Sequence, residues 1–372
     1  MKAALLLENL LGKISFLNNA VAPRAQLPIL SGILIKAEKG KLKISATDLE
    51  TGIEIEVPAS VEEEGAVAVP ARAFSDFVSS LSEEKITIES APSGVLVSGK
   101  KASARINTLD EGEFPKIYEE KGEETISVSE EGLLKGLPRV VFAASPDTGR
   151  PAFSGVLFRK EGDGLLMVAT DSHRLSLDKT KGAVASEALK KGVVVSAKTL
   201  RVLLSRKGGG DARVYVSEKN GQIIFSQKDA TLVGRLIETD YPEFEKIIPQ
   251  DSSTKTEFDG GQLLAALKTA SVFARDNANI VKLSIKKASL VVSAKSPTLG
   301  ENTVEIEAKT TGEENEIAFN GHYLLELLQN VDDEEMFFQM TGPLNPGVFK
   351  SKKNPDFVHL IMPIRVRDEE LK

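Results

Sequence analysis

The chain repeats a short frame of residues at a fixed interval. Ser31-Gly32 precedes Ala46-Thr47-Asp48 in the first copy, and the same five residue types recur 123 positions later in a second copy that ends at Asp171. A weaker third copy occupies 279–300. Three steps of about 124 residues fill the 372-residue chain, so internal repetition restricts the possible folds more than any other feature.

The repeat length is also a plausible domain length. A single hydrophobic core rarely serves more than ~250–300 residues, and domains cluster near ~100–150 residues. Hydrophilic stretches at 118–125 and 250–255 separate the copies. We therefore predict three similar domains, at 1–125, 126–252 and 253–372.

Each copy has two helix-type patterns and several strand-type patterns in the same order. Apolar residues recur at helical spacing in 5–21, 129–145 and 259–276, and again in 70–81, 196–207 and 320–331. Pro138 predicts a break in one of these helices, and Ser129, Ser196, Asp259 and Asn320 are suited to be N-caps of four of them. The fold class expected from alternating strands and paired helices is α+β, with two helices packed on one side of β-sheets in every domain.

Composition favours a soluble globular protein. Hydrophobic residues make up 41% of the chain and charged residues 27%, and no apolar run approaches the ~20 residues of a membrane span. The first 17 residues resemble a signal peptide, but Glu8 and Lys13 interrupt them, so an amphipathic helix is expected there. A chain without cysteine has no disulfides, which agrees with a cytoplasmic location.

Charge is distributed unevenly along the chain. The formal net charge of −7 argues against a broadly basic surface of the kind that binds nucleic acid. The helix-type segments nevertheless carry more basic than acidic residues, and the basic ones are Lys13, Arg24, Arg72, Lys135, Arg139, Lys198, Arg201, Arg206, Lys207, Lys268 and Arg275. A basic helical layer on an acidic body suits a protein that surrounds one polyanion, although ordinary solvated helix faces explain the same count equally well.

Helix packing geometry favours the first of these two interpretations. Helices pack ~8–10 Å apart, so six helices from one chain form a circle only ~17 Å across between axes, which helix widths of ~10–12 Å close. Twelve helices from two chains leave a bore of roughly 23 Å by the same geometry. Because a B-form duplex is roughly 20 Å wide, only a two-chain ring fits it closely.

Enzyme signatures are weak. Ser172 and His173 are neighbours on an extended segment, so their side chains point to opposite faces and cannot share a proton. The three histidines lie in unrelated contexts and there is no cysteine, so no metal-ligand spacing emerges. The segment 94–101 is similar to a phosphate-binding loop, but Lys101 stands where a hydroxyl is needed. We expect no catalytic residues, no metal and no cofactor.

Four segments in order resemble the β sliding clamps, the processivity subunits of bacterial DNA polymerase III. They are LPILSGILI with ATDLETGI, RPAFSGVLF with ATDSHRL, DYPEFEKIIP, and VHLIMPIRV near the end. The resemblance spans nearly the whole chain. It implies a head-to-tail homodimeric ring of six similar domains, each chain being half of the closed ring. A clamp loader would place this ring around double-stranded DNA, where it tethers the replicative polymerase α subunit and other proteins that carry clamp-binding motifs.

The resemblance also assigns roles to individual residues. The implied pocket for partner peptides consists of Phe153, Thr170, His173, Arg174, Leu175, Leu177, Pro242, Ile247, Leu360, Ile361, Met362, Pro363, Ile364 and Arg365. Implied DNA-facing residues are Arg24, Arg72, Lys198 and Arg201. Ile106 of one chain is implied to meet Val272 and Phe273 of the next.

The residues themselves agree with a peptide pocket. Apolar side chains suit the anchors of a linear motif, and Arg174 can fix its polar residue. His173-Arg174 has no counterpart in the first copy of the frame, which points to a function of the second copy alone. Ser172, Lys246 and Ile364 depart from the common family residues glycine, arginine and methionine, and an acidic tail follows at 368–372. A ring-like or arc-like recruitment scaffold that does not thread DNA stays open as the alternative.

Overall fold

The computed structural model describes residues 1–24, 26–92, 94–121, 124–128, 132–180, 183–185, 187–206, 208 and 210–365. They form two compact units. Unit 1 comprises Met1–Glu130 and Lys198–Leu236, and unit 2 comprises Glu131–Ala197 and Ile237–Lys372. The three domain ranges stay a prediction. Among the described residues, no helix has the length and apolar character needed to cross a membrane.

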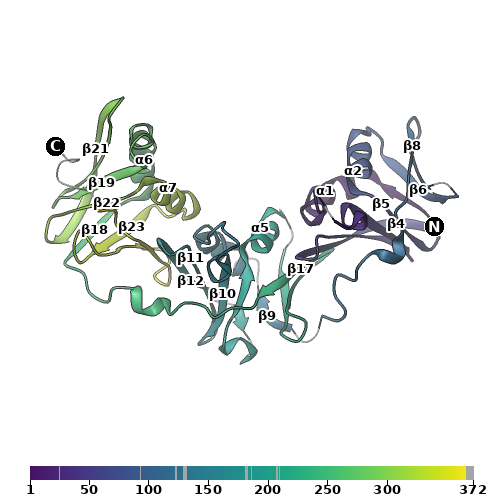
Figure 1. Cartoon of the computed structure of the whole chain (residues 1–372), viewed down its shortest axis with the longest axis horizontal. Coiled ribbons are helices and arrows are strands. Elements are labelled where there is room, and N and C mark those ends of the chain that lie inside the picture. Colours follow the sequence, from purple (N-terminus) through teal and green to yellow (C-terminus); the bar gives the residue numbers. More distant parts are fainter. Residues whose placement is uncertain are drawn as a thin grey trace. The chain divides into compact units, whose positions relative to one another are not determined.

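Unit 1 is built on antiparallel strands and α-helices (Figure 1). Its helices are α1 (Leu7–Leu17), α2 (Ala71–Ser80) and α5 (Ala197–Ser205). Its strands are β1 (Lys2–Leu6), β2 (Gly32–Glu38), β3 (Lys41–Thr47), β4 (Thr51–Glu63), β5 (Gly65–Pro70), β6 (Lys85–Ala91), β7 (Gly94–Ser98), β8 (Ser103–Ile106), β9 (Glu124–Val128), β15 (Ala212–Ser217), β16 (Gln222–Gln227) and β17 (Ala230–Ile237).

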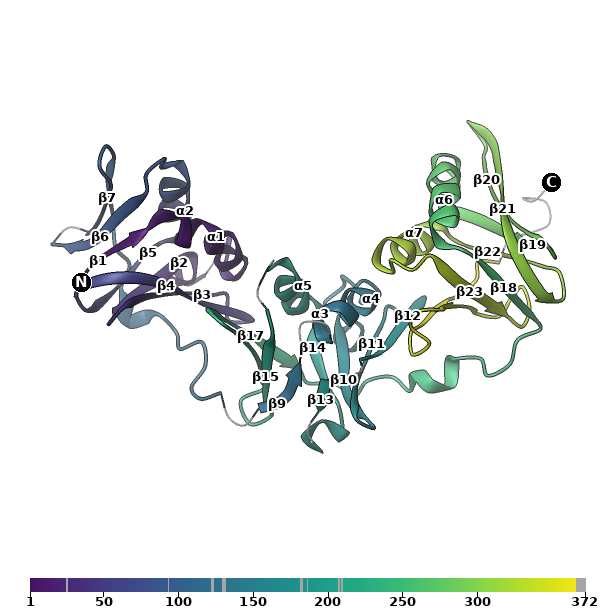
Figure 2. The same ribbon diagram turned by 180° about the vertical axis from the view of Figure 1, so that it is seen from behind.

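Unit 2 holds the remaining elements (Figure 2). Its helices are α3 (Leu133–Gly136), α4 (Pro138–Val141), α6 (Gly260–Ala274) and α7 (Gly321–Asn330). Its strands are β10 (Gly155–Glu161), β11 (Gly164–Thr170), β12 (Arg174–Thr180), β13 (Ala183–Ala185), β14 (Val193–Ser196), β18 (Thr254–Asp259), β19 (Ile280–Ile285), β20 (Ser289–Ser296), β21 (Gly300–Gly312), β22 (Asn315–Asn320), β23 (Glu335–Met340), β24 (Gly347–Ser351) and β25 (Val358–Ile361).

The two units share one sheet topology. In unit 1 the strands run β5-β2-β3-β4-β17-β16-β15-β9, all antiparallel. In unit 2 they run β14-β10-β11-β12-β25-β24-β23-β18. Each sheet therefore joins a hairpin of the repeated frame to strands from the following part of the chain, through β4 and β17 in unit 1 and through β12 and β25 in unit 2.

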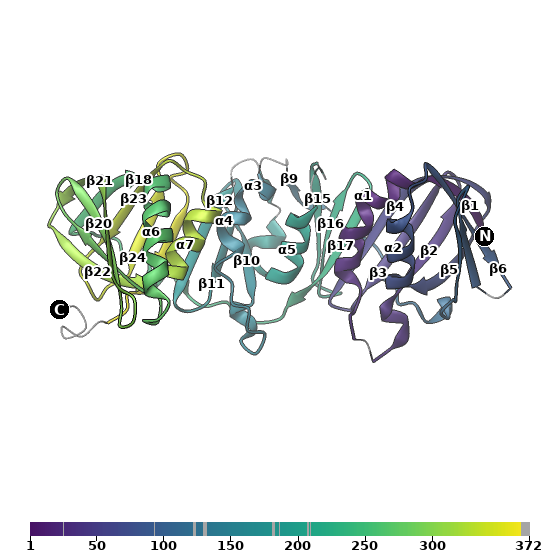
Figure 3. The ribbon, with the colours of Figure 1, turned by 90° about the horizontal axis from the view of Figure 1, so that it is seen from above.

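Helices and strands largely follow the residue patterns. Asp259 caps α6 by accepting a hydrogen bond from the Gln262 amide at 2.7 Å, and Asn320 caps α7 through the His322 amide at 3.0 Å. The helix predicted to break at Pro138 is divided into α3 and α4 there, which confirms that prediction. In each unit the helices lie over one face of the strands, with α1 beside α2 and α6 beside α7 (Figure 3).

The prediction that the first residues form a helix is wrong. Residues Lys2–Leu6 form β1, which pairs with both β4 and β6, and α1 begins only at Leu7. Ala3 and Leu5 are buried in this strand while their neighbours are not. An apolar run this short fits both the helical and the strand period. Pairing with two neighbouring strands makes it a strand.

Candidate functional site

The repeated Ala-Thr-Asp residues fold into the same turn twice. In the second copy, Asp171 Oδ1 accepts the amides of His173 at 2.9 Å and Arg174 at 3.0 Å. In the first copy, Asp48 Oδ1 accepts the amides of Glu50 at 3.0 Å and Thr51 at 2.6 Å. An aspartate that bonds the backbone two and three residues ahead stabilises a tight turn. The sequence repeat is therefore a repeat of hydrogen bonds.

Ser172 lies at the strained position of the second turn, so the expectation that Ser172 and His173 are on an extended segment is wrong. Ser172 has φ 78° and its counterpart Leu49 has φ 74°, in the left-handed region that favours glycine. The Ser172 amide donates to Thr170 Oγ1 at 3.1 Å, which helps to hold the turn. This backbone requirement explains why glycine suits the position.

The second turn and the end of the chain form one continuous surface. Leu175 lies opposite Leu360 and Leu177 lies opposite Val358 in the β12–β25 ladder. Beyond the ladder, the Met362 amide donates to the His173 carbonyl at 2.8 Å. The structure thus brings together two predicted pocket segments that are far apart in sequence.

A hydrophobic cluster lies under this surface. Leu175 and Leu360 are fully buried in it and Phe244 is nearly so, while Leu177 and Tyr241 pack against it. Burial raises the pKa of Tyr241, whose hydroxyl donates to the Val168 carbonyl at 3.0 Å. The cluster fixes the floor of the surface.

Apolar side chains remain exposed above this floor. Ile247 is 47% exposed and Met362 is 41% exposed. Of the other predicted pocket residues, Phe153, Pro242, Pro363 and Ile364 are half-buried, Ile361 is buried, and His173 and Arg365 are exposed. Exposed apolar groups over a rigid apolar floor can accept the anchor side chains of a peptide.

Two of the predicted pocket residues already have internal partners. The buried Thr170 hydroxyl donates to the Arg174 carbonyl at 2.6 Å. The Arg174 side chain is only 6% exposed and donates to Asp171 Oδ2, to Glu326 Oε2 and to the Phe142 carbonyl. Contact of Arg174 with a peptide stays a prediction.

The partners of Arg174 were not predicted from the sequence. Tyr323 and Glu326 lie on α7, and the guanidinium carbon of Arg174 is 4.5 Å from the centre of the Tyr323 ring. Phe142 follows α4, and its ring centre is 5.4 Å from the same carbon. No motif marks these residues, because they meet Arg174 only through tertiary packing.

The corresponding site in unit 1 is closed by the chain itself. Gly52 takes the place of Leu175, and a β-carbon on Gly52 would overlap Ile117. Gln222 Nε2 donates to the Ile117 carbonyl at 3.2 Å, and the Tyr118 hydroxyl donates to Glu54 at 3.2 Å. The same turn therefore supports an apolar surface in unit 2 and a polar, self-occupied junction in unit 1.

The predicted DNA-facing residues all lie in unit 1. Arg24, Arg72, Lys198 and Arg201 have exposed side chains. Lys198 Nζ is 2.6 Å from Asp48 Oδ2, and Arg72 pairs with Asp76 one helical turn away. Their contact with DNA stays a prediction.

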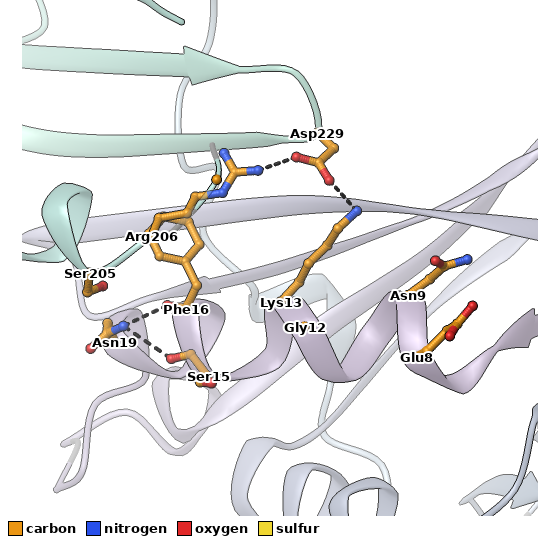
Figure 4. Close-up of a pocket in the computed structure, with 11 residues that line it drawn as sticks. Glu8, Asn9, Gly12, Lys13, Ser15, Phe16, Asn19, Ser205, Arg206 and Asp229 are labelled. Atoms are coloured by element: carbon orange, nitrogen blue, oxygen red, sulfur yellow. Dashed lines mark hydrogen bonds and ion pairs between the residues drawn. The ribbon is translucent and has the colours of Figure 1, made fainter. Parts of the chain in front are cut away.

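Other basic residues of the helices are neutralised within unit 1 (Figure 4). Lys13 Nζ lies 2.5 Å from Asp229 Oδ2, and Arg206 pairs with the other oxygen of the same carboxylate. They line one wall of a cavity of about 670 Å³, together with polar residues of α1 such as Asn9. Lys207 lies outside the described residues, as does the tail at 368–372.

The residues predicted to join two chains differ in exposure. Ile106 ends β8 and is buried beside Val95. Val272 on α6 is 51% exposed, and Phe273 is half-buried. Contact between these residues of two chains stays a prediction.

Comparison with known proteins identifies the family. Models of the DNA polymerase III β subunit match residues 1–118 with the N-terminal domain, 127–243 with the central domain and 245–365 with the C-terminal domain. The β sliding clamp of Bacillus subtilis is 31% identical over 378 residues, covering 98% of this chain and 100% of that protein. The β sliding clamp of Synechococcus elongatus is 30% identical over 361 residues, covering 95% and 96%.

A solved structure leads to the same family. The crystal structure of the DNA polymerase sliding clamp from Bacillus subtilis superimposes with a TM-score of 0.92 at 31% identity, covering 99% of this chain and 100% of that one. Sequence and fold agree over nearly the full length. The chain belongs to the β subunits of bacterial DNA polymerase III, the β sliding clamp family.

Proposed function

We propose that this sliding clamp works as a head-to-tail pair of chains that closes around double-stranded DNA, independently of its sequence. The ring would hold the replicative polymerase α subunit, the clamp loader and other motif-bearing proteins through the surface around Leu175, and it would catalyse no reaction itself. Family membership supports the clamp function. It favours this reading over a scaffold that does not thread DNA.

One observation carries the peptide-binding part of the proposal. Four positions that face the pocket side of the frame differ in kind between its two copies: the second copy has Leu166, Val168, Leu175 and Leu177 where the first has Lys43, Ser45, Gly52 and Glu54. The register of the β11–β12 pair is the same as that of the β3–β4 pair, so the fold does not require apolar residues at these four positions. Apolar residues at those four places form an apolar floor, above which the exposed Ile247 and Met362 can meet apolar peptide anchors.

The helices of unit 1 support the DNA-binding part. Arg72 is exposed on α2, Lys198 and Arg201 are exposed on α5, and Arg24 is exposed in the segment that follows α1. Each can neutralise a phosphate without reading a base. Sequence-independent sliding requires this kind of contact. The pairing of Ile106 with Val272 and Phe273 of a second chain, and the division into three domains, belong to the same proposal.

DNA topology tests the proposal. Protein loaded on a nicked circular duplex by its clamp loader is expected to stay bound through gel filtration and to dissociate when the circle is cut, because a ring leaves through free ends. Replacing Arg72 and Lys198 with glutamine should shorten retention on the circle and reduce its dependence on salt. Equal retention on circular and linear DNA would contradict encirclement and favour the scaffold.

A further inference from the structure

The buried arginine of the pocket turn links that turn to a helix far away in sequence. Arg174 belongs to the turn, since its amide and carbonyl bond Asp171 and Thr170. Its side chain extends to α7, where it pairs with Glu326. The two residues are separated by 152 positions, and both lie in unit 2.

The guanidinium group is held on several sides. Arg174 Nε donates to Asp171 Oδ2 at 3.1 Å and one terminal nitrogen donates to the Phe142 carbonyl at 2.9 Å. The rings of Phe142 and Tyr323 lie near the guanidinium. A planar guanidinium bonded in its plane and stacked on aromatic rings is fixed in orientation. The group therefore acts as a rigid spacer between turn and helix.

The first copy of the turn offers a natural comparison. There Thr51 replaces Arg174, and Thr51 Oγ1 lies 3.4 Å from Thr199 Oγ1 of α5. The turn carboxylate of Asp48 is instead paired with Lys198, also of α5. Each turn is thus tied to a helix of the next copy of the repeat, α5 for the first turn and α7 for the second, but only the second turn is tied to a carboxylate of its helix.

We propose that Glu326 is a positioning residue for the peptide pocket, holding the turn 170–175 in place through Arg174. This inference rests on the proposed function of that surface. Leu175 and the His173 carbonyl, which meets the Met362 amide, belong to the same turn, so a shift of Arg174 displaces one wall of the pocket. The arrangement assigns Arg174 mainly to the support of the pocket.

The substitution Glu326→Gln separates support from direct contact. It removes the charge that holds Arg174 while changing no predicted pocket residue. The probe is the tightest-binding member of a set of fluorescein-labelled peptides that tile the polymerase α subunit. If Arg174 positions the turn, Glu326→Gln weakens binding of this peptide at least fivefold at an unchanged unfolding midpoint. If Arg174 is a direct peptide donor, freeing it leaves binding unchanged or strengthens it, which overturns the inference.

Two variants control this measurement. His322 lies one helical turn before Glu326, and its Nε2 is 3.6 Å from the Glu326 carboxylate. The substitution His322→Ala removes this neighbour and is expected to change peptide binding less than twofold. In an Arg174→Met background, adding Glu326→Gln should have no further effect. A further fivefold loss in that background would show that Glu326 acts independently of Arg174 and would overturn the inference.

Amide hydrogen exchange tests the support without any peptide. Glu326→Gln is expected to speed exchange of the His173 and Arg174 amides at least fivefold. The amides of Glu50 and Thr51, in the same turn of unit 1, provide an internal reference that should not change. Unchanged exchange at His173 and Arg174 overturns the inference. If the wild-type chain binds none of the peptides while amide exchange changes as expected, the proposed function is contradicted and the support of the turn by Glu326 is not.

Discussion

At the scale of single residues, His359 shows how burial fixes a charge state under the pocket. Its side chain is fully buried in β25, and within the described part of the chain neither ring nitrogen has a hydrogen-bond partner. Its ring centre lies 5.2 Å from that of Phe142. Burial, together with the smaller effect of the nearby charge of Arg174, lowers the pKa of His359 to about 3. The ring is therefore neutral in the folded protein at physiological pH.

This neutral histidine should make stability depend on pH. The unfolded chain takes up a proton at His359 near its ordinary pKa of ~6.5, whereas the folded chain does so only near 3, so stability is lost as pH falls below ~6.5. Between pH 7.5 and 5.5 the wild-type protein should lose roughly 1.4 kcal/mol more than His359→Leu. Urea unfolding followed by circular dichroism measures the difference. Parallel losses in the two proteins would show that His359 does not contribute.

At the scale of elements, the repeated turn and the linker that packs near it differ between the two units. In unit 2, Leu175 occupies the end of the turn and Ile247 of the following linker is left exposed. In unit 1, Gly52 leaves room at the same place, and Ile117 of the corresponding linker fills it. The absence of a side chain at Gly52 thus allows Ile117 to pack on the first turn.

Filling that space should destabilise unit 1 without affecting the pocket. Gly52→Leu must displace Ile117, and overpacking of this kind costs typically ~1–3 kcal/mol. We expect a lower urea midpoint and faster proteolysis within 111–121, with unchanged peptide affinity. Gly12→Leu is the matched control, because a β-carbon at Gly12 meets nothing within 4 Å. Gly52→Leu as stable as this control would contradict the packing argument.

At the scale of the whole molecule, the net charge of −7 coexists with a basic set of helices, but fewer charges are available than the sequence count suggests. Lys13 and Arg206 share Asp229, and Arg139 pairs with the buried Asp178. These cations stabilise the fold and contribute little to an external field. The proposed attraction for DNA therefore falls to basic residues whose side chains are exposed, such as Arg72 and Lys198, although these two also lie beside carboxylates, those of Asp76 and Asp48.

The proposed pairing of chains predicts a change in mass. Analytical ultracentrifugation at micromolar concentration should show a dimer for the wild type. A buried, unpaired carboxylate is costly, so Val272→Asp should shift the mass toward one chain. Leu344→Asp, which alters another exposed apolar residue (58% exposed), should leave the dimer intact. A wild-type protein of single-chain mass would contradict the two-chain ring, and a dimeric Val272→Asp would move the interface elsewhere.

The sequence by itself determined the features that depend on neighbouring residues. The Ala-Thr-Asp turns, the caps at Asp259 and Asn320 and the break at Pro138 follow from hydrogen bonds and ring geometry within a few positions. The repeat also indicated, through His173-Arg174, that the second copy has a function of its own, because this comparison needs only aligned sequence. Interactions between residues a few positions apart can be inferred directly from such sequence patterns.

Only the tertiary structure decided the contacts between distant segments. It placed Lys2–Leu6 as a strand between β4 and β6, seated Ile117 on Gly52 and joined Arg174 to Glu326. Each outcome depends on a partner that the local sequence does not specify, and for a short apolar run or a lone charge that partner outweighs intrinsic preference. The hydrogen bonds of the pocket turn are thus local to 170–174, although an extended segment was expected there, whereas the support of the turn depends on how the chain folds around it.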